Sequence, residues 1–285
     1  METAICYQEK DFRIALKTVV VIIPVYLPTL SEDERISFCR TLEVLGHHII
    51  VLVCPNNFES NEFDDLARKY NVKLRYERFD NSFFKGIEGY NRLLLSDLFY
   101  RRFQQFQYIL ICQLDTYVFK DELNEWCYKG YDYIGPPLFD DENPKISIEG
   151  MTVGNGGFSL RKVQSFLNFF DSNKNVFSPS QIVDLISLWR KPHTRIFVWA
   201  LMCLGWRNKA RSVARRYRYN EDCFWCILLD GSRFSLKRPK PEEALSFAFE
   251  RFPKQMYQLN HYALPFGCHG WRKYQYNDFW KEFIP

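Results

Sequence analysis

The chain has 285 residues, which is enough for one large domain or two modest ones with a substantial buried core. Its net charge of +4 is too small to indicate a nucleic-acid-binding protein, and no segment has the roughly 18 apolar residues that span a bilayer. Nine cysteines without regular spacing, and a first segment unlike a secretory leader, predict a reducing, cytoplasmic setting. Cys223 and Cys226 form a C-x-x-C pair, but it lacks the second ligand pair of a zinc site and the context of a redox site.

The first part of the chain alternates strands and helices. A β-branched run at 17–26, interrupted by Pro24, predicts a buried parallel strand that ends in a turn. Four further elements follow: a helix at 31–45, a strand at 48–54, a helix at 62–70 and a strand at 72–78. This order predicts parallel strands with right-handed crossovers, and the carboxyl ends of such strands form a ligand-binding edge.

A segment with two glycines, 82–92, opens the next helix, which we expect to run to about residue 101. Its glycines would let the backbone approach a ligand closely, and Lys85 and Asn91 would donate hydrogen bonds to a phosphate or a base. The alternative is a helix start softened by glycine, with its charges in water.

The apolar segment 108–119 predicts the central strand, and it runs into one carboxylate, Asp115. Burying an unpaired carboxylate would cost several kcal/mol, so we expect Asp115 to end the strand facing a cleft, a cation or a set of donors. The alternative is that Asp115 caps the turn that follows.

Two glycine-containing segments and an acidic pair lie downstream. After a polar segment at 139–150, which predicts a mobile loop, Asn155, Gly156 and Gly157 form a turn whose amides could hold a sugar or a phosphate. A plain hairpin turn is the alternative. Glu221 and Asp222 begin an apolar helix, where one carboxylate would cap the helix and the other would face the cleft. His269 lies between glycines that would bring its imidazole close to a ligand, although a histidine in a loop is often inert.

The pattern of residues 179–189 predicts a helix, and the composition of the chain changes after it. An apolar stretch at 195–206 continues into a basic stretch at 207–218, a pattern typical of an interfacial membrane anchor. A core helix followed by a solvated or phosphate-facing basic face is the alternative. No RNA-binding motif accompanies these arginines.

Four short motifs together resemble those of GT-A-type glycosyltransferases, and more narrowly those of a largely uncharacterised bacterial family. They are Gln-Leu-Asp-x-x-Val-Phe at 113–119, Gly-Asn-Gly-Gly-Phe-Ser-Leu-Arg at 154–161, Glu-Asp-x-Phe-Trp at 221–225 and Phe-Gly-x-His-Gly-Trp at 266–271. The resemblance covers about residues 19–271. It implies a single α/β domain with a GT-A, Rossmann-like fold, whose mixed, mainly parallel sheet is flanked by helices. Residues of about 17–135 would be the nucleotide-binding half, and residues of about 150–285 would be the acceptor and catalytic half, including the apolar and basic insertion.

The resemblance also implies roles for individual residues. The nucleotide sugar would be bound by residues from both halves: Pro24, Val25, Tyr26, Lys85, Asn91, Gln113, Asp115, Asn155, Gly156 and Gly157. A divalent cation, Mn²⁺ or Mg²⁺, would be held by Asp115 and His269, although Tyr117 stands where the family has its second aspartate. Asp222 would be the general base, and Glu221 would position the acceptor.

These features predict a nucleotide-sugar-dependent, hexosyltransferase-like enzyme, with a UDP-sugar as donor and inversion at the anomeric carbon. It would act on a glycan or a lipid-linked acceptor in surface polysaccharide synthesis, as a peripheral protein at the inner face of the cell membrane. Two alternatives stay open. One is a catalytically silent membrane-associated scaffold, which the missing second aspartate favours, and the other is a nucleotidyltransferase, although 24–30 lacks its glycine-rich signature.

Overall fold

A six-stranded sheet forms the centre of the molecule, and the computed structural model describes residues 18–138, 151–187 and 192–285. The strand order is β3-β2-β1-β4-β9-β6; the first four strands are parallel, and β9 runs antiparallel to both of its neighbours. Their bounds are Val19–Pro24 for β1, Ile49–Pro55 for β2, Arg75–Phe79 for β3, Tyr108–Cys112 for β4, Tyr133–Ile134 for β6 and Phe158–Lys162 for β9. The predicted mixed, mainly parallel sheet is therefore confirmed.

Strand β1 is buried on both faces because it is apolar throughout. Val20 and Ile22 contribute to one hydrophobic core, whereas Val21 and Ile23 contribute to a second. Successive residues of a strand face opposite sides of the sheet, so one continuous apolar run fills two cores.

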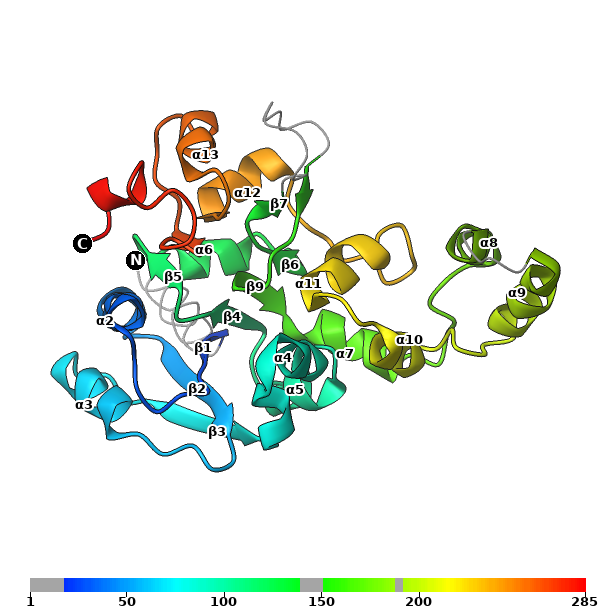
Figure 1. Cartoon of the computed structure of the whole chain (residues 1–285), viewed down its shortest axis with the longest axis horizontal. Helices are drawn as coiled ribbons and strands as arrows, with labels where there is room; N and C mark the ends of the chain where they lie inside the picture. Colours follow the sequence, from blue (N-terminus) through cyan, green and yellow to red (C-terminus); the bar gives the residue numbers. More distant parts are fainter. Residues whose placement is uncertain (1–17, 139–150, 188–191) are drawn as a thin grey trace, which may run out of the picture.

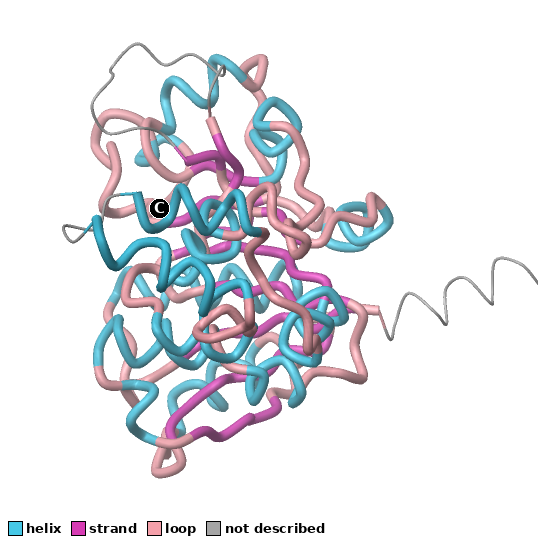
Figure 2. Tube along the Cα trace, turned by 90° about the vertical axis from the view of Figure 1, so that its right-hand side faces the viewer, coloured by secondary structure: helices cyan, strands magenta, loops and turns pink. Residues whose placement is uncertain are grey.

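Helices cover both faces of the sheet (Figures 1 and 2), as predicted. Four of those that pack in the first core are α4 (Gly86–Leu94), α5 (Asp97–Arg102), α7 (Val163–Asp171) and α10 (Ala210–Arg216). Those that pack in the second core include α2 (Glu32–Leu45), α3 (Asn61–Lys69), α6 (Leu123–Tyr128) and α12 (Pro241–Phe247). Ser31 begins α2 with a capping box, in which its hydroxyl and the Glu34 carboxylate satisfy free backbone amides.

The end of the chain builds a third core around a smaller sheet. Its strands, in the order β10-β11-β5, are Ala248–Phe249, Gly267–His269 and Thr116–Val118. Trp271, Phe279 and Trp280 are buried there, so the aromatic residues near the end of the chain fill this core. Further short elements are β7 (Pro137–Leu138), β8 (Thr152–Val153), α11 (Glu221–Cys223), the π-turn η3 (Phe224–Leu228), α13 (Pro253–Leu259) and the 3₁₀ turn η4 (Trp280–Glu282).

Two predicted elements end earlier than the sequence indicated. The helix expected up to residue 101 is split into α4 and α5, after the 3₁₀ turn η1 (Asn81–Phe84), because Ser96 is extended and its hydroxyl donates to the Leu93 carbonyl, 2.6 Å away. The central strand β4 stops at Cys112 and does not reach Asp115. Thr116 donates through its amide and its hydroxyl to the Gln113 carbonyl, at 3.0 and 2.7 Å, and this turn redirects the chain into the smaller sheet. The loop expected at 139–150 and the end of the helix expected at 179–189 lie outside the described residues.

A helical hairpin extends to one side of the sheet (Figure 1). It contains α8 (Pro179–Ser187), the 3₁₀ turn η2 (Pro192–Thr194) and α9 (Arg195–Cys203). The side chains of Ile196 and Phe197 on α9 are among its exposed apolar groups, with 80% and 67% of their residue surface in solvent. Within the described ranges, no helix has the length and apolar character needed to cross a membrane.

Candidate active site

Asp115 and His269 meet because strands β5 and β11 are paired. His269 lies opposite Thr116 in this antiparallel pair, and the Gly270 amide donates to the Asp115 carbonyl at 2.9 Å. This pairing places the Nε2 atom of His269 3.3 Å from the Oδ1 atom of Asp115. Asp115 is half exposed, so the pair lies where a ligand can reach it.

A second carboxylate orients the imidazole from its other side. The Nδ1 atom of His269 lies 3.1 Å from the Oε1 atom of Glu250, which follows β10 and is buried. Burial alone would lower the pKa of His269, but its hydrogen bonds to Asp115 and Glu250 raise the pKa to about 10. Burial acts to raise the pKa of Asp115, yet the contact with His269 holds it below its ordinary value. Sequence reasoning missed Glu250, although a carboxylate directly after a short apolar strand was a signal of the same kind as Asp115.

Gly157 is the reason that the glycine loop can lie against this pair. A Cβ atom at position 157 would come 2.1 Å from the Nε2 atom of His269, a distance that real Cβ atoms do not show. The Gly157 carbonyl also accepts a hydrogen bond from the Gln113 amide at 3.0 Å. The loop thus contacts both the end of β4 and the candidate ligand histidine.

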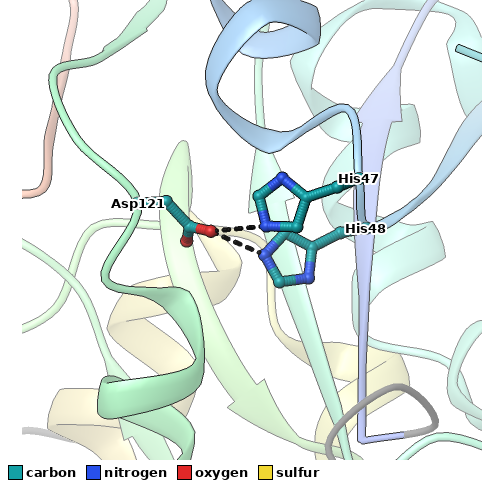
Figure 3. Close-up of side chains that lie close together, drawn as sticks. All are labelled: His47, His48 and Asp121. Carbon is teal, nitrogen blue, oxygen red and sulfur yellow. Dashed lines mark hydrogen bonds and ion pairs between the residues drawn. The ribbon is translucent and has the colours of Figure 1, made fainter.

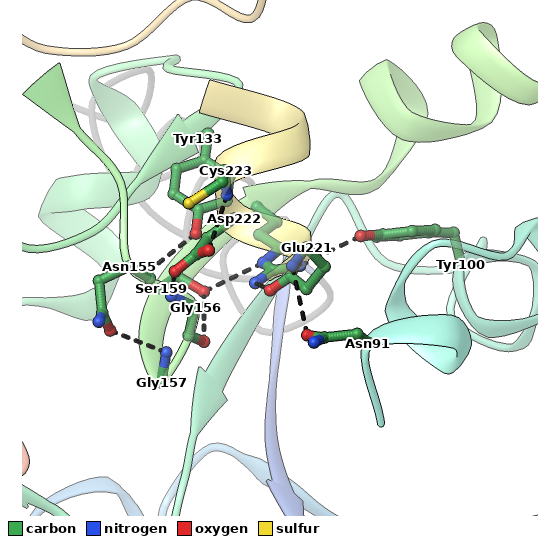
Figure 4. Close-up of polar contacts among 11 residues, drawn as sticks. Asn91, Tyr100, Tyr133, Asn155, Gly156, Gly157, Ser159, Glu221, Asp222 and Cys223 are labelled. Carbon is green, nitrogen blue, oxygen red and sulfur yellow. Dashed lines mark hydrogen bonds and ion pairs between the residues drawn. The ribbon is translucent and has the colours of Figure 1, made fainter. Parts of the chain in front are cut away.

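The same loop touches the acidic pair on its other side (Figure 4). The Gly156 amide donates to the Oδ2 atom of Asp222 at 3.2 Å, and a Cβ atom at position 156 would come 2.3 Å from the Oε1 atom of Glu221. Asn155 adopts a left-handed conformation (φ 59°), and its Oδ1 atom accepts from the Gly157 amide at 3.0 Å. Asn155, Gly156 and Gly157 therefore connect the histidine pair to the acidic pair.

Glu221 and Asp222 have different surroundings. Glu221 is 3% exposed, and its two oxygens accept from Arg161 at 2.6 and 3.0 Å, while Arg161 itself is fully buried. Burial raises the pKa of Glu221 and the guanidinium of Arg161 acts against this; Glu221 in turn raises the pKa of Arg161. Asp222 is only partly buried, with its Oδ1 atom accepting from the Cys223 amide at 2.7 Å. A carboxylate has about four acceptor sites, so Asp222 keeps room for an incoming hydroxyl.

The residues after β1 lie at the same edge of the sheet. Val25 is buried and its amide donates to the Val53 carbonyl at 2.8 Å, whereas Tyr26 exposes 59% of its surface. Partial burial raises the pKa of Tyr26, and the carboxylates of Glu34 and Asp115 add to this, so its phenol group is within electrostatic range of Asp115. Pro24 closes the strand, which leaves Tyr26 as the exposed aromatic ring of this segment.

Helix α4 supplies one predicted residue to the site and leaves another outside it. The Oδ1 atom of Asn91 accepts from the Glu221 amide at 3.2 Å, and Tyr90 hydrogen-bonds the side chain of Gln113. Lys85 is exposed ahead of α4, and within the described residues no hydrogen bond or ion pair joins it to the other predicted site residues.

A cavity of about 330 Å³ is lined by residues of α4 and α10, and neither Glu221 nor Asp222 is among its lining residues. Asn91, which binds the Glu221 amide, lines one side of it, and Tyr219, three residues before Asp222, lines another. Its basic lining residues are Arg92, Arg211, Arg215 and Arg218. The arginines come from α4, α10 and the segment after α10, so part of the predicted basic insertion faces this cavity.

The donor atoms of Asp115 and His269 fit a divalent cation that takes the rest of its ligands from phosphate and water. With Nδ1 held by Glu250, the imidazole presents Nε2 toward Asp115, an arrangement that frequently orients metal-binding histidines. Tyr117, at the position of the second aspartate, is 8% exposed and packs in the third core near Trp271. It supplies no carboxylate, and only two protein ligands are therefore available at this edge among the described residues.

The sequence of the chain matches a known protein family. The family described as "Protein of unknown function (DUF5672)" matches residues 73–269, more than half of the chain. No curated protein matches the chain.

Solved structures that are similar to the chain include a glycosyltransferase, a core-mannan synthase and a complex with UDP-GlcNAc. GlyE of Streptococcus pneumoniae TIGR4 has 10% identity and a TM-score of 0.46, with 89% of this chain and 54% of GlyE covered. Core-mannan synthase A of Aspergillus fumigatus, in its Mn/GDP form, has 8% identity and a TM-score of 0.38, with 73% and 71% covered. S. aureus TarS 1-349 in complex with UDP-GlcNAc has 12% identity and a TM-score of 0.34, with 53% and 47% covered. The chain spans about half the length of GlyE and of this TarS fragment.

Proposed function

The chain belongs to the DUF5672 family, and we propose that it is a glycosyltransferase that uses a nucleotide sugar as donor. The observation that carries this proposal is the position of the glycine loop. Gly157 lies against His269 and, through it, Asp115, while Gly156 lies against Glu221 and Asp222. A candidate cation-binding pair and a carboxylate that can take a proton thus lie on the two sides of one glycine turn at the carboxyl edge of the parallel strands. Sugar transfer from a nucleoside diphosphate can use both, because a cation offsets the charge on the leaving group and a carboxylate takes the proton of the acceptor hydroxyl.

We assign the donor to the half of about 17–135. The exposed ring of Tyr26 suits stacking against a nucleotide base, and Asp115 and His269 would hold Mn²⁺ or Mg²⁺ at the diphosphate. When bound, such a cation offsets the negative charge that develops on the departing diphosphate. The motif resemblance favours a UDP-sugar as the donor.

Asp222 is the proposed general base. Its carboxylate would take the proton of an acceptor hydroxyl while the hydroxyl oxygen bonds to the anomeric carbon and the bond from that carbon to the diphosphate breaks. Direct displacement from the opposite face inverts the anomeric centre. The amides of Gly156 and Cys223 fix the carboxylate orientation. Glu221 was predicted to position the acceptor; since both of its oxygens bind Arg161, we propose that it acts by holding the loop and α11 in place.

The acceptor half, about 150–285, offers two surfaces. The arginine-lined cavity, which reaches Asn91 next to Glu221, suits an acceptor with a phosphate or other anionic group, such as a lipid-linked glycan. Helix α9 exposes Ile196 and Phe197 near its start, the half-exposed Trp206 follows the helix, and the basic helix α10 comes next. Apolar groups beside cations are typical of proteins that lie on a membrane surface, and we propose that this insertion does so.

A thermal-shift screen of nucleoside diphosphates and their sugars, with and without Mn²⁺, tests the donor assignment. A ligand at 100 times its Kd stabilises the folded state by about 2.7 kcal/mol, so a UDP compound should raise the Tm clearly. Asp222→Asn should bind this donor normally and lose transfer by at least about a hundredfold, whereas the exposed control Asp65→Asn should keep it. No shift with any nucleotide would instead favour the silent scaffold, which the buried Tyr117 supports.

A further inference from the structure

Two adjacent histidines and one aspartate point at one another (Figure 3), and none of them belongs to the candidate active site. The Nε2 atom of His47 lies 2.8 Å from the Oδ2 atom of Asp121, and the Nε2 atom of His48 lies 3.0 Å from the same oxygen. The two imidazole rings lie 4.2 Å apart between centroids. All three ligand atoms are within 4.8 Å of one another. Three donor atoms thus face one small volume.

The fold itself brings these residues together. Helix α2 ends at Leu45, the His48 amide donates to the Leu45 carbonyl at 2.9 Å, and β2 begins directly afterwards, so the histidines lie in a tight turn. Strand β5 runs along α2, where Arg40 donates to the Val118 carbonyl at 2.8 Å. Asp121 follows β5 and therefore arrives at the same end of α2 as the histidines.

The carboxylate is held in an orientation that leaves one oxygen for the histidines. The Oδ1 atom of Asp121 accepts from the Leu123 amide at 2.9 Å, while Oδ2 faces both imidazoles. One carboxylate oxygen of Asp121 is thus fixed by the backbone, and the other is directed at the two imidazole rings.

We propose that His47, His48 and Asp121 form a second metal site that binds Zn²⁺ or a similar late first-row cation. Two imidazole nitrogens and one carboxylate oxygen are the ligand types that zinc takes, whereas Mg²⁺ and Ca²⁺ prefer an all-oxygen shell. Ligands at about 2.0–2.1 Å from a tetrahedral zinc lie about 3.3 Å from one another, so the two contacts with Asp121 need to widen by a few tenths of an ångström, and the two histidine nitrogens, which are within 4.8 Å, need to take the same separation. The exposed face of His47, with 61% of its side chain in solvent, leaves the fourth position for water.

This ion would tie the start of β2 to the segment after β5. Because β5 begins directly after Asp115, the strand would be fixed at both ends, by the candidate active site and by the second metal site. Helix α2 spans the distance between them with 14 residues, about 20 Å at 1.5 Å per residue. Because none of its three ligands is a residue of the candidate active site, the second metal site does not depend on the proposed transferase function.

Zinc titration of the full chain without nucleotide tests the site, with ZnCl₂ as the probe and calorimetry and bound-metal analysis as the readouts. His47→Ala removes one ligand from an exposed position, so the fold should survive, and Asp121→Asn removes the anionic ligand. His193→Ala, at another exposed histidine, is the matched control. Loss of a residue that only hydrogen-bonds a metal ligand weakens metal affinity 10–100-fold. We therefore expect the zinc affinity of both ligand variants to fall at least tenfold, and bound-metal analysis to find one ion fewer per chain.

His193→Ala should bind zinc like the wild type, and His47→Ala should retain transfer activity measured with Mn²⁺. Unchanged zinc stoichiometry and affinity in both His47→Ala and Asp121→Asn would overturn the site. So would zinc binding that disappears entirely in His269→Ala, because the ion would then belong to the active-site pair. A failed nucleotide screen would remove the transferase proposal and leave this result untouched.

Discussion

Replacing Glu221 with alanine should lower the unfolding free energy more than a substitution on the surface does. Arg161 is fully buried, and Glu221 is its counter-ion through two hydrogen bonds of 2.6 and 3.0 Å. The other groups that bind the guanidinium, the hydroxyls of Ser159 and Tyr100, are neutral. Glu221→Ala therefore leaves a buried positive charge without a counter-ion.

Breaking a buried ion pair by removing one partner costs about 3–5 kcal/mol of unfolding free energy. At roughly 2–4 °C per kcal/mol, this lowers the Tm by about 10 °C. Urea unfolding followed by circular dichroism measures the change, with the slope m checked for constancy.

Glu88→Ala is the matched control, because Glu88 also pairs with arginine, Arg92, but 65% of its side chain is exposed. Exposed pairs contribute at most about 1 kcal/mol, so this variant should unfold close to the wild type. An unfolding free energy of Glu221→Ala within about 1 kcal/mol of the wild type would refute the proposal that Glu221, paired with Arg161, holds the loop and α11 in place.

Three further results are expected. Gly157→Ala should lose about 1–3 kcal/mol of stability by overpacking, and the loss should vanish in a His269→Ala background, since the clash is with that imidazole. With divalent cations removed by a chelator, the protonated His269 should stabilise the fold fully below its unfolded pKa of about 6.5 and progressively less as the pH rises through about 10. The difference in unfolding free energy between the wild type and His269→Asn should therefore shrink over that pH range, and a constant difference would contradict this. Phe197→Ser should reduce sedimentation with anionic vesicles several-fold, while Tyr128→Ser, equally exposed on α6, should not; equal binding by both would argue against the hairpin as the membrane contact.

The local pattern of the sequence was sufficient for most of the sheet and its helices. The β-branched run of β1 and the capped amphipathic α2 are governed by short-range rules, side-chain alternation and helix capping, which can be read without the tertiary structure. The predicted ends of α4 and β4 were wrong because a side-chain hydroxyl at each end binds a backbone carbonyl. Ser96 ended α4 through its hydroxyl, and the Gln113 carbonyl ended β4 by accepting from Thr116.

The sequence by itself was enough to select the candidate site residues, which are Asp115, the glycine loop, the acidic pair and His269, because each follows a recognisable element. Only the tertiary structure decided what each one touches. Glu250 became the partner of His269 through the pairing of β10 with β11, and Glu221 became the partner of Arg161 through contacts 60 positions apart. Such partners depend on long-range strand pairing and packing, for which no local pattern carries information.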